Sequence, residues 1–567
     1  MQLICVGALL TIFSLYIVPK LCRTSKANYL DRCARQIQQW LRACSNHPGH
    51  NCTQSGSDIL PRRLIFLDTE PNTQRLVQAT GSPKYVALSY CWGPNANEHF
   101  KTVPSNLHIM EKSIPHQDLP QTLKDVFSLV RKLGYQYLWI DALCIVQDDN
   151  GAEWHTEAAK MGDVYANADL VIAAMASSGV NSGLNLASET NFTAEQKSEF
   201  HYIMRTCRTM TQQKWYQIRS TYPLLCRGWA FQERLLARRI VHFTIMELIW
   251  ECTGDRWCEC GGDVREKLTG SINNMNSALK QCRLDSSPLR LMKQTLMWRE
   301  CVKSYSKRDL TVNGDRLYAI NGIASYIRGP DSPSYHQLYF HGLWKDSMPW
   351  DLLWYCDQTS EFASQKPRGP SYSWCSVDCG IEWMTCKHWE PQQKFSLAIS
   401  TGTCLEFAQN EQDVQLAKFE LLPPQAPQSG SHPAEERVVP LQIDSKMTAV
   451  HIRSYSGSEK QALHPDSLGL VEANGSGCTG VLPFYPDTDL KDLESDDSRP
   501  YYYIEIMRSL PRNAGLVIRP KTDAQIGEEG GLFERVGLAG DISCEVKIMD
   551  SCWSWSADVE TCSVLLV

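Results

Sequence analysis

Between residues 85 and 176, short apolar runs alternate with longer amphipathic stretches. "KYVALSYCWG", "YQYLWID" and "DLVIAAMA" are apolar runs of strand length. The stretches between them, "LPQTLKDVFSLVRKLG" and "NGAEWHTEAAKMGDVYANA", place their apolar residues on one helical face. The order strand, helix, strand, helix, strand predicts a parallel sheet flanked by helices.

A carboxylate, Asp141, ends the second apolar run, and Ser89, Tyr90 and Trp92 end the first. The carboxyl ends of parallel strands meet at one edge of a sheet, where ligands bind in open α/β folds. The pattern therefore predicts a polar crevice, in which Asp141 binds a ribose hydroxyl or acts as a base. The structural alternative is that Asp141 caps a helix or loop, or pairs with Arg227.

The rest of the chain divides into segments that differ in apolar pattern and composition. A helix and two short strands ("RRLIFLD", "RLVQA") precede the alternating region, and a helix at residues 229–236 with two strands ("RIVHF", "ELIWEC") follows it. A further helix is predicted at residues 336–360, and Pro-, Gly- and Ser-rich loops between strand-like runs mark the C-terminal part. We expect five segments: a membrane anchor at 1–20, a lead-in at 28–80, the α/β unit at 81–260, a helical extension at 261–365 and a β-rich region at 366–567.

The first 20 residues, "MQLICVGALLTIFSLYIVPK", carry no charge before Lys20 and can just cross a bilayer. Basic residues follow, so the positive-inside rule predicts a single membrane anchor with a cytoplasmic body. The alternatives are a misassigned start or a buried hydrophobic helix.

Composition narrows the class of protein. A chain of 567 residues is too long for one compact core. A net charge of -7, with no Lys/Arg run, argues against nucleic-acid binding. The 23 cysteines are scattered rather than arranged as in a small disulfide-rich domain, which favours a reducing compartment.

Three blocks resemble the signature blocks of the fungal heterokaryon incompatibility (HET) domain. They are "YVALSYCWG" (residues 85–93), "LGYQYLWIDALCIVQDD" (133–149) and "RGWAFQERLLARRIVHF" (227–243). Their order and spacing agree with the family, and the resemblance covers residues 80–255. Downstream, "YSKRDLTVNGDRLYAINGIA" and "GPSYSWCSVD" resemble the extension often found with this domain. The chain has no G-x-x-x-x-G-K-[ST] motif, so it does not resemble the large receptor-type members.

The resemblance implies a role in non-self recognition between fungal individuals, where incompatible encounters trigger programmed cell death. It also implies an architecture like that of TIR domains, the flavodoxin-like modules of innate immunity, some of which cleave NAD. A membrane anchor departs from the usual soluble pattern of the family. Shared fold does not establish shared chemistry.

Two acids are the candidate catalytic residues, Asp141 and Glu233. Glu233 lies in "FQER", where a carboxylate beside an amide and a guanidinium can position a sugar or polarise a water. Its structural alternative is an ion pair with Arg227 or Arg234. The candidate ligand-binding residues are Ser89, Tyr90, Trp92, Gly93, Arg227 and Gln232.

The cysteine and histidine residues give weaker evidence for a functional site than the two acids do. Cys144 is expected to be a buried structural residue, because no histidine is paired with it by sequence. "CSNHPGHNC" carries the zinc-ligand types Cys44, His47, His50 and Cys52, but four ligands this close rarely enclose one ion without strain. The predicted set of sites therefore includes no metal and no cofactor, and Cys252 ranks below this loop.

Two mechanisms remain open at the level of sequence. In the first, the α/β unit is an enzyme that hydrolyses a nucleotide such as NAD, with Asp141 and Glu233 flanking it. In the second, it is a non-enzymatic assembly and signalling module that acts by homo-oligomerisation, and the acids are structural. Both predict an unidentified partner protein as the recognised signal.

Overall fold

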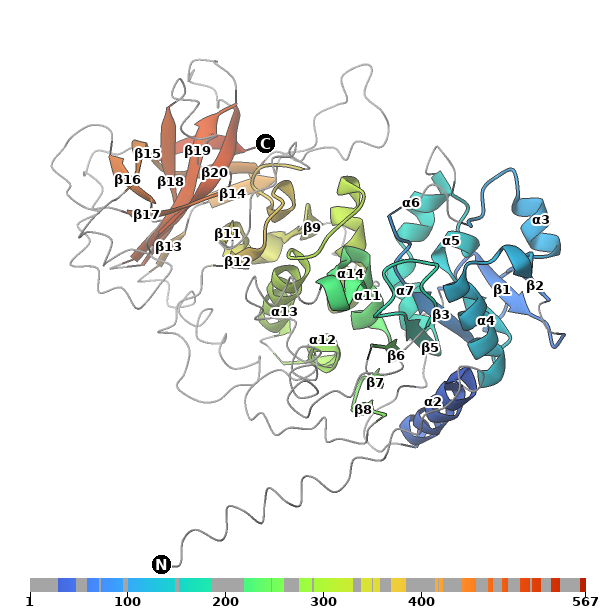
Figure 1. The fold of residues 1–567 in the computed structure, drawn as a ribbon. Helices are drawn as coiled ribbons and strands as arrows, with labels where there is room; N and C mark the ends of the chain where they lie inside the picture. Colours follow the sequence, from blue (N-terminus) through green and yellow to red (C-terminus); the bar gives the residue numbers. More distant parts are fainter. Residues whose placement is uncertain are drawn as a thin grey trace, which may run out of the picture.

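The structure of the protein is a computed structural model (Figure 1). A helix-covered sheet lies at one side, helices and short strands lie in the middle, and a β-rich region lies at the other side. The structure describes residues 29–46, 52, 59–70, 73–94, 100–147, 152–184, 219–245, 247–259, 275–287, 290–329, 338–348, 350–356, 369–383, 414–416, 418–421, 441–454, 468–472, 482–487, 500–509, 512–521, 532–540 and 561–566.

Eight strands form the first sheet, in the order β2–β1–β4–β3–β5–β6–β7–β8. The four central strands are parallel: β4 (Tyr137–Trp139), β3 (Tyr85–Ser89), β5 (Leu170–Ala173) and β6 (Arg239–Phe243). Antiparallel strands flank them: β2 (Gln74–Gln78) and β1 (Arg63–Leu67) on one side, β7 (Leu248–Cys252) and β8 (Arg256–Cys258) on the other. The predicted parallel sheet is confirmed at the centre, and the flanks make the whole sheet mixed.

Helices cover both faces of the parallel strands. α4 (Gln121–Leu133) connects β3 to β4, and α7 (Met161–Asn167) leads back to β5 on the other side of β3. Right-handed connections that run in opposite directions along a sheet lie on opposite faces. α2 (Tyr29–Ser45) packs beside α4, and α11 (Gly228–Leu236) packs beside α7. This double cover explains why β3 and β5 are buried at every position.

The chain turns sharply after β4. The short helix α5 (Asp141–Cys144) begins at the carboxylate that ends the strand. The Asp141 carboxylate accepts a hydrogen bond of 2.7 Å from the backbone N–H of Ala142. The charge that interrupts the apolar run therefore marks the carboxyl end of strand β4.

Helices form the segment that directly follows the first sheet. The described ones are α12 (Met275–Leu284), α13 (Arg290–Tyr305) and α14 (Tyr318–Arg328), as the sequence predicts. The other described helices of three turns or fewer are α3 (Leu107–Lys112), α6 (Ala152–Ala158) and α10 (Pro223–Cys226).

The helix predicted at residues 336–360 is wrong. The described part of this segment forms β9 (Tyr339–Phe340), β10 (Leu343–Trp344) and β11 (Trp354–Cys356), with short 3-10 turns. Gly342 has a φ of 84°, and a Cβ there would lie 2.6 Å from the indole nitrogen of Trp374. Close packing of buried tryptophans thus fixes a reversal that the apolar pattern of the segment conceals.

The C-terminal region is β-rich, as predicted. Its described strands pair in the order β13–β18–β19–β20–β17–β16–β15–β14, and β15 also pairs with β18 and β21. Cys356 and Cys379 form a disulfide beside β12 (Ile381–Trp383), which pairs with β11. The strands of the large sheet are β13 (Val414–Leu416), β14 (Lys418–Leu421), β15 (Leu441–Ser454), β16 (Leu468–Glu472), β17 (Leu482–Pro486), β18 (Tyr501–Ser509), β19 (Arg512–Pro520), β20 (Leu532–Gly540) and β21 (Thr561–Leu566).

Two hydrophobic cores share helix α11. Ala230 belongs to the core of the first sheet, together with β3, β4, β5 and β6. Phe231, Leu235 and Leu236 belong instead to the core that runs through α13, α14 and the C-terminal sheet. α11 therefore has neighbours in both halves of the molecule.

The transmembrane prediction requires correction. Across the part of the chain that the structure describes, we find no helix with the combined length and apolarity needed to cross a bilayer. Residues 1–20, on which the prediction rested, lie outside that part.

Candidate functional site at the carboxyl ends of the parallel strands

The predicted site residues come from two strand ends and one helix. Register pairs Val86 with Leu138 and Ser89 with Ala173, so the ends of β3, β4 and β5 lie side by side. Helix α11 begins after Arg227 and carries Gln232 and Glu233. The common rim that the sequence predicts for these strands is therefore present.

Ser89 and Glu233 form the inner contact of the site. The Ser89 hydroxyl donates a hydrogen bond to the Glu233 carboxylate across 144 residues of sequence. Both side chains are buried, with exposed fractions of 3% and 6%. This bond joins the end of β3 to the middle of α11.

Asp141, Trp92, Tyr90 and Arg227 form the outer contacts. The Trp92 indole N–H donates a hydrogen bond of 2.9 Å to Asp141. The Arg227 guanidinium donates to the backbone carbonyl of Tyr90. Burial and the nearby Asp141 charge raise the pKa of the Tyr90 hydroxyl. We call Ser89, Tyr90, Trp92, Asp141, Arg227 and Glu233 the rim cluster.

One guanidinium faces two carboxyl groups in the rim cluster. Burial raises the pKa of Asp141, and the Arg227 charge opposes that rise. Burial also raises the pKa of Glu233 to about 7, although the Ser89 hydrogen bond and the Arg227 charge oppose it. A carboxyl group with this pKa exchanges its proton near neutral pH, which suits a general acid or base.

A match to a family model covers residues 85–233, described as "Heterokaryon incompatibility protein (HET)". It begins at the first residue of β3 and ends at Glu233, so it contains the whole rim cluster. This chain carries a HET domain.

A curated relative of the HET-domain chain is "Heterokaryon incompatibility protein 6, OR allele" from Neurospora crassa (strain ATCC 24698 / 74-OR23-1A / CBS 708.71 / DSM 1257 / FGSC 987). The two are 34% identical over 96 residues, which is 16% of this chain and 14% of the relative. The chain thus matches about a seventh of the length of that relative. No solved structure matches the chain.

Two predicted ligand-binding residues of the HET domain lie apart from the rim cluster's hydrogen bonds. Gln232 is fully buried, and neither polar atom of its amide has a hydrogen-bond partner among the described residues. It faces α14, because a Cβ at Gly322 would lie 2.8 Å from its Oε1. Gly93 has a φ of 98° and forms the turn after β3, close to Gly179.

Other residues of the HET domain have clear structural roles. Glu157 accepts a hydrogen bond of 3.2 Å from the backbone N–H of Arg62 and pairs with Lys160. Arg234 pairs with Glu251 at 3.0 Å. Burial raises the pKa of Cys144 to about 12, which agrees with an unreactive core thiol.

The sequence did not single out Tyr165, which lies against the rim cluster. Its hydroxyl donates a hydrogen bond of 2.9 Å to the backbone carbonyl of Leu88, and its proximity to Glu233 opposes the rise in the pKa of that carboxyl group. The helical periodicity of α7 assigns Tyr165 to the apolar face. Only the convergence of α7 with the end of β3 reveals its polar contact.

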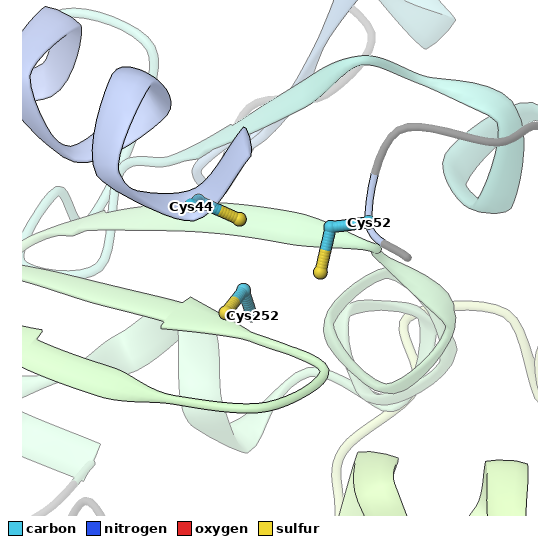
Figure 2. Close-up of side chains that lie close together, drawn as sticks. All are labelled: Cys44, Cys52 and Cys252. Atoms are coloured by element: carbon cyan, nitrogen blue, oxygen red, sulfur yellow. The ribbon is translucent and has the colours of Figure 1, made fainter. Parts of the chain in front are cut away.

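Three cysteines are the metal-ligand candidates among the described residues: Cys44, Cys52 and Cys252 (Figure 2). All three are buried, and their Sγ atoms lie within 4.8 Å of one another. The predicted loop supplies the first two, whereas His47 and His50 lie outside the described residues. Sequence spacing could not connect Cys252 to this loop, because 200 residues separate it from Cys52.

Proposed function

We propose that this HET-domain protein acts as an effector of fungal non-self recognition and that its rim cluster hydrolyses a nucleotide such as NAD. The observation that carries the proposal is the placement of Glu233, which is buried at the carboxyl edge of a parallel sheet and hydrogen-bonded to Ser89. Burial raises the pKa of Glu233 to about 7, which suits a general acid or base. The curated relative is itself named a heterokaryon incompatibility protein. The outcome would be a programmed cell-death response in incompatible encounters.

The winding of the parallel strands supports a TIR-like, flavodoxin-like unit. In chain order the parallel strands are β3, β4, β5 and β6, and they lie in the sheet as second, first, third, fourth. Flavodoxin-like sheets begin with this order and bind ligands beside their first strand, at the switch point with the third. Ser89 lies at the corresponding strand end. We propose that residues 81–260 are this unit, that residues 261–365 extend it, and that residues 366–567 recognise a partner.

The proposed chemistry breaks the glycosidic bond between nicotinamide and ribose. The bond electrons leave with nicotinamide, water adds to the ribose carbon, and one proton is released. The Glu233 carboxylate would hydrogen-bond a ribose hydroxyl and stabilise the positive charge that develops on the sugar. Arg227 would hold the phosphates of the nucleotide by charge-assisted hydrogen bonds.

The direct test is nicotinamide release from NAD by the purified full chain. We expect turnover by the wild type and a loss of about 100-fold or more in Glu233→Gln. The exposed residue Glu111, on α3, provides a matched control, and Glu111→Gln should keep full turnover. Folded protein that kills cells without consuming NAD would overturn the enzymatic proposal.

The second candidate function is assembly without catalysis. It is favoured by the internal partners of both acids, since Ser89 bonds Glu233 and Trp92 bonds Asp141. In that case homo-oligomerisation would carry the signal, and Glu233→Gln would retain toxicity in cells. Toxicity and turnover measured on the same variant therefore separate the two candidates.

A further inference from the structure

Helix α2 places a cysteine at the end of its buried stripe. Cys33, Ile37, Trp40 and Cys44 follow one another at spacings of four, three and four residues, and all are buried. The stripe faces the sheet, since the Trp40 ring packs 6.1 Å from the Trp250 ring of β7. Cys44 therefore reaches the sheet where the helix ends.

Two other thiols meet Cys44 at this point. Cys252 is the last residue of β7, and Cys52 belongs to the segment after α2. Figure 2 shows the three side chains beside one another, although they come from three separate parts of the chain. Their exposed fractions are 2% for Cys44, 1% for Cys52 and 0% for Cys252. Cys52 also contacts the Thr253 hydroxyl at 2.9 Å.

The spacing of the sulfur atoms fits one tetrahedral ion. Zinc–sulfur bonds of about 2.3 Å place the sulfur ligands of a tetrahedral site about 3.8 Å apart. The Sγ atoms of the trio lie within 4.8 Å of one another, so small side-chain adjustments bring them onto a zinc ion. Thiolate ligands select zinc over the oxygen-seeking ions magnesium and calcium.

Nearby cations suit a negatively charged thiolate site. The Lys280 ammonium interacts electrostatically with all three cysteines, and Arg238 interacts with Cys52. Three thiolates on a divalent zinc ion leave one net negative charge. A buried charge of this kind needs compensation, and these two side chains supply it.

We propose that Cys44, Cys52 and Cys252 bind a structural zinc ion that ties α2 to the end of β7. The chain supplies three of the four ligands of a tetrahedral site through these thiolates. The ion fixes helix α2 against β7 of the first sheet. This proposal is independent of nucleotide hydrolysis at the rim cluster.

The test begins with the full chain expressed with zinc under reducing conditions. Elemental analysis after gel filtration should find about one zinc per chain. Zinc X-ray absorption should show three sulfur ligands and one lighter ligand. The absence of zinc, or a spectrum with nitrogen and oxygen ligands only, would overturn the proposal.

Variants locate the site. Cys252→Ala and Cys44→Ala should lose the zinc, whereas Cys33→Ala, another buried cysteine on α2, should keep it. Zinc retained in Cys252→Ala would overturn the assignment. Because either variant could misfold, the wild type is also loaded with cobalt, whose thiolate charge-transfer absorption reports sulfur ligation directly. Mass spectrometry of the unreduced wild type gives a further check, since a disulfide within the trio and no metal would contradict the site.

Discussion

Glu233 makes the stability of the protein depend on pH in a definite direction. Burial raises its pKa from an ordinary value of 4.5 to about 7, so the folded state binds this proton more tightly than the unfolded state. The stabilisation is complete below about pH 4.5 and is lost as pH rises through about 7. The full effect is on the order of 3 kcal/mol.

Denaturant unfolding of wild type and Glu233→Gln at pH 5 and pH 8 checks this dependence. The amide does not ionise, so the variant should gain stability relative to wild type at pH 8. Glu111→Gln repeats the carboxylate-to-amide change at an exposed position and should show no such crossover. An equal difference between wild type and Glu233→Gln at both pH values would refute the prediction.

At this scale the sequence located the rim cluster but could not describe its pairing. The apolar runs predicted which residues end the strands, because a buried strand stops where polar side chains begin. The Ser89–Glu233 bond depends on the packing of α11 over β3, which no local pattern encodes. Gln232 illustrates the limit, since its neighbour Glu233 joins the rim cluster while its own side chain faces α14.

At the scale of elements, α7 and α14 touch through glycines. A Cβ at Gly162 would lie 2.8 Å from the Cα of Gly322, so no larger residue fits without moving one helix. Gly162→Ala should therefore lower the free energy of unfolding by about 1–3 kcal/mol. Gly314→Ala is the control, because a Cβ there meets nothing within 4 Å. Thermal melts of both variants, compared with the wild type, test whether the contact between the two glycines is tight.

Arg535 joins the C-terminal sheet to β11. Its guanidinium donates to the Asp487 carboxylate at 2.7 Å and to the Leu352 carbonyl at 2.7 Å, and it lies 3.5 Å from the centre of the Trp354 ring. Arg535→Ala leaves a buried carboxylate without its partner and should cost about 3–5 kcal/mol.

The neighbouring strand provides the comparison for this prediction. Arg519 on β19 pairs with Glu534 at 2.6 Å, but both side chains are partly exposed. Arg519→Ala should therefore cost about 1 kcal/mol or less. Chemical denaturation of both variants measures the loss of unfolding free energy. Similar losses in the two variants would contradict this prediction.

Helices and strands were predicted correctly where the apolar periodicity of a local segment determines its structure. The prediction failed where packing against distant residues determines it. α4 follows its apolar stripe to Gly134, whose φ of 86° ends the helix as its sequence predicts. The segment around Gly342 has a helix-like density of apolar residues, yet its tryptophans are buried in several directions. The indole of Trp374, 32 residues away, fixes the turn there.

At the scale of the whole molecule, α11 makes the two halves interdependent. Phe231, Leu235 and Leu236 are buried against the extension rather than against the sheet. A fragment of residues 29–259 exposes them and should aggregate or bind a hydrophobic dye. A fragment of residues 29–329, which restores α12, α13 and α14, should be less prone to both. A monomeric, dye-free shorter fragment, seen by size-exclusion chromatography, would contradict this dependence.

The antiparallel flanks of the first sheet also constrain how copies of the chain can meet. Among the described strands, β2 and β8 form the borders of the sheet, and the strands that end in the rim cluster are enclosed between them. A second copy that adds strands to the border does so at β2 or β8, away from Asp141 and Glu233. Self-association by strand addition and chemistry at the two acids therefore depend on different parts of the sheet. The border strands could change in evolution while the acids stayed constant, and the reverse.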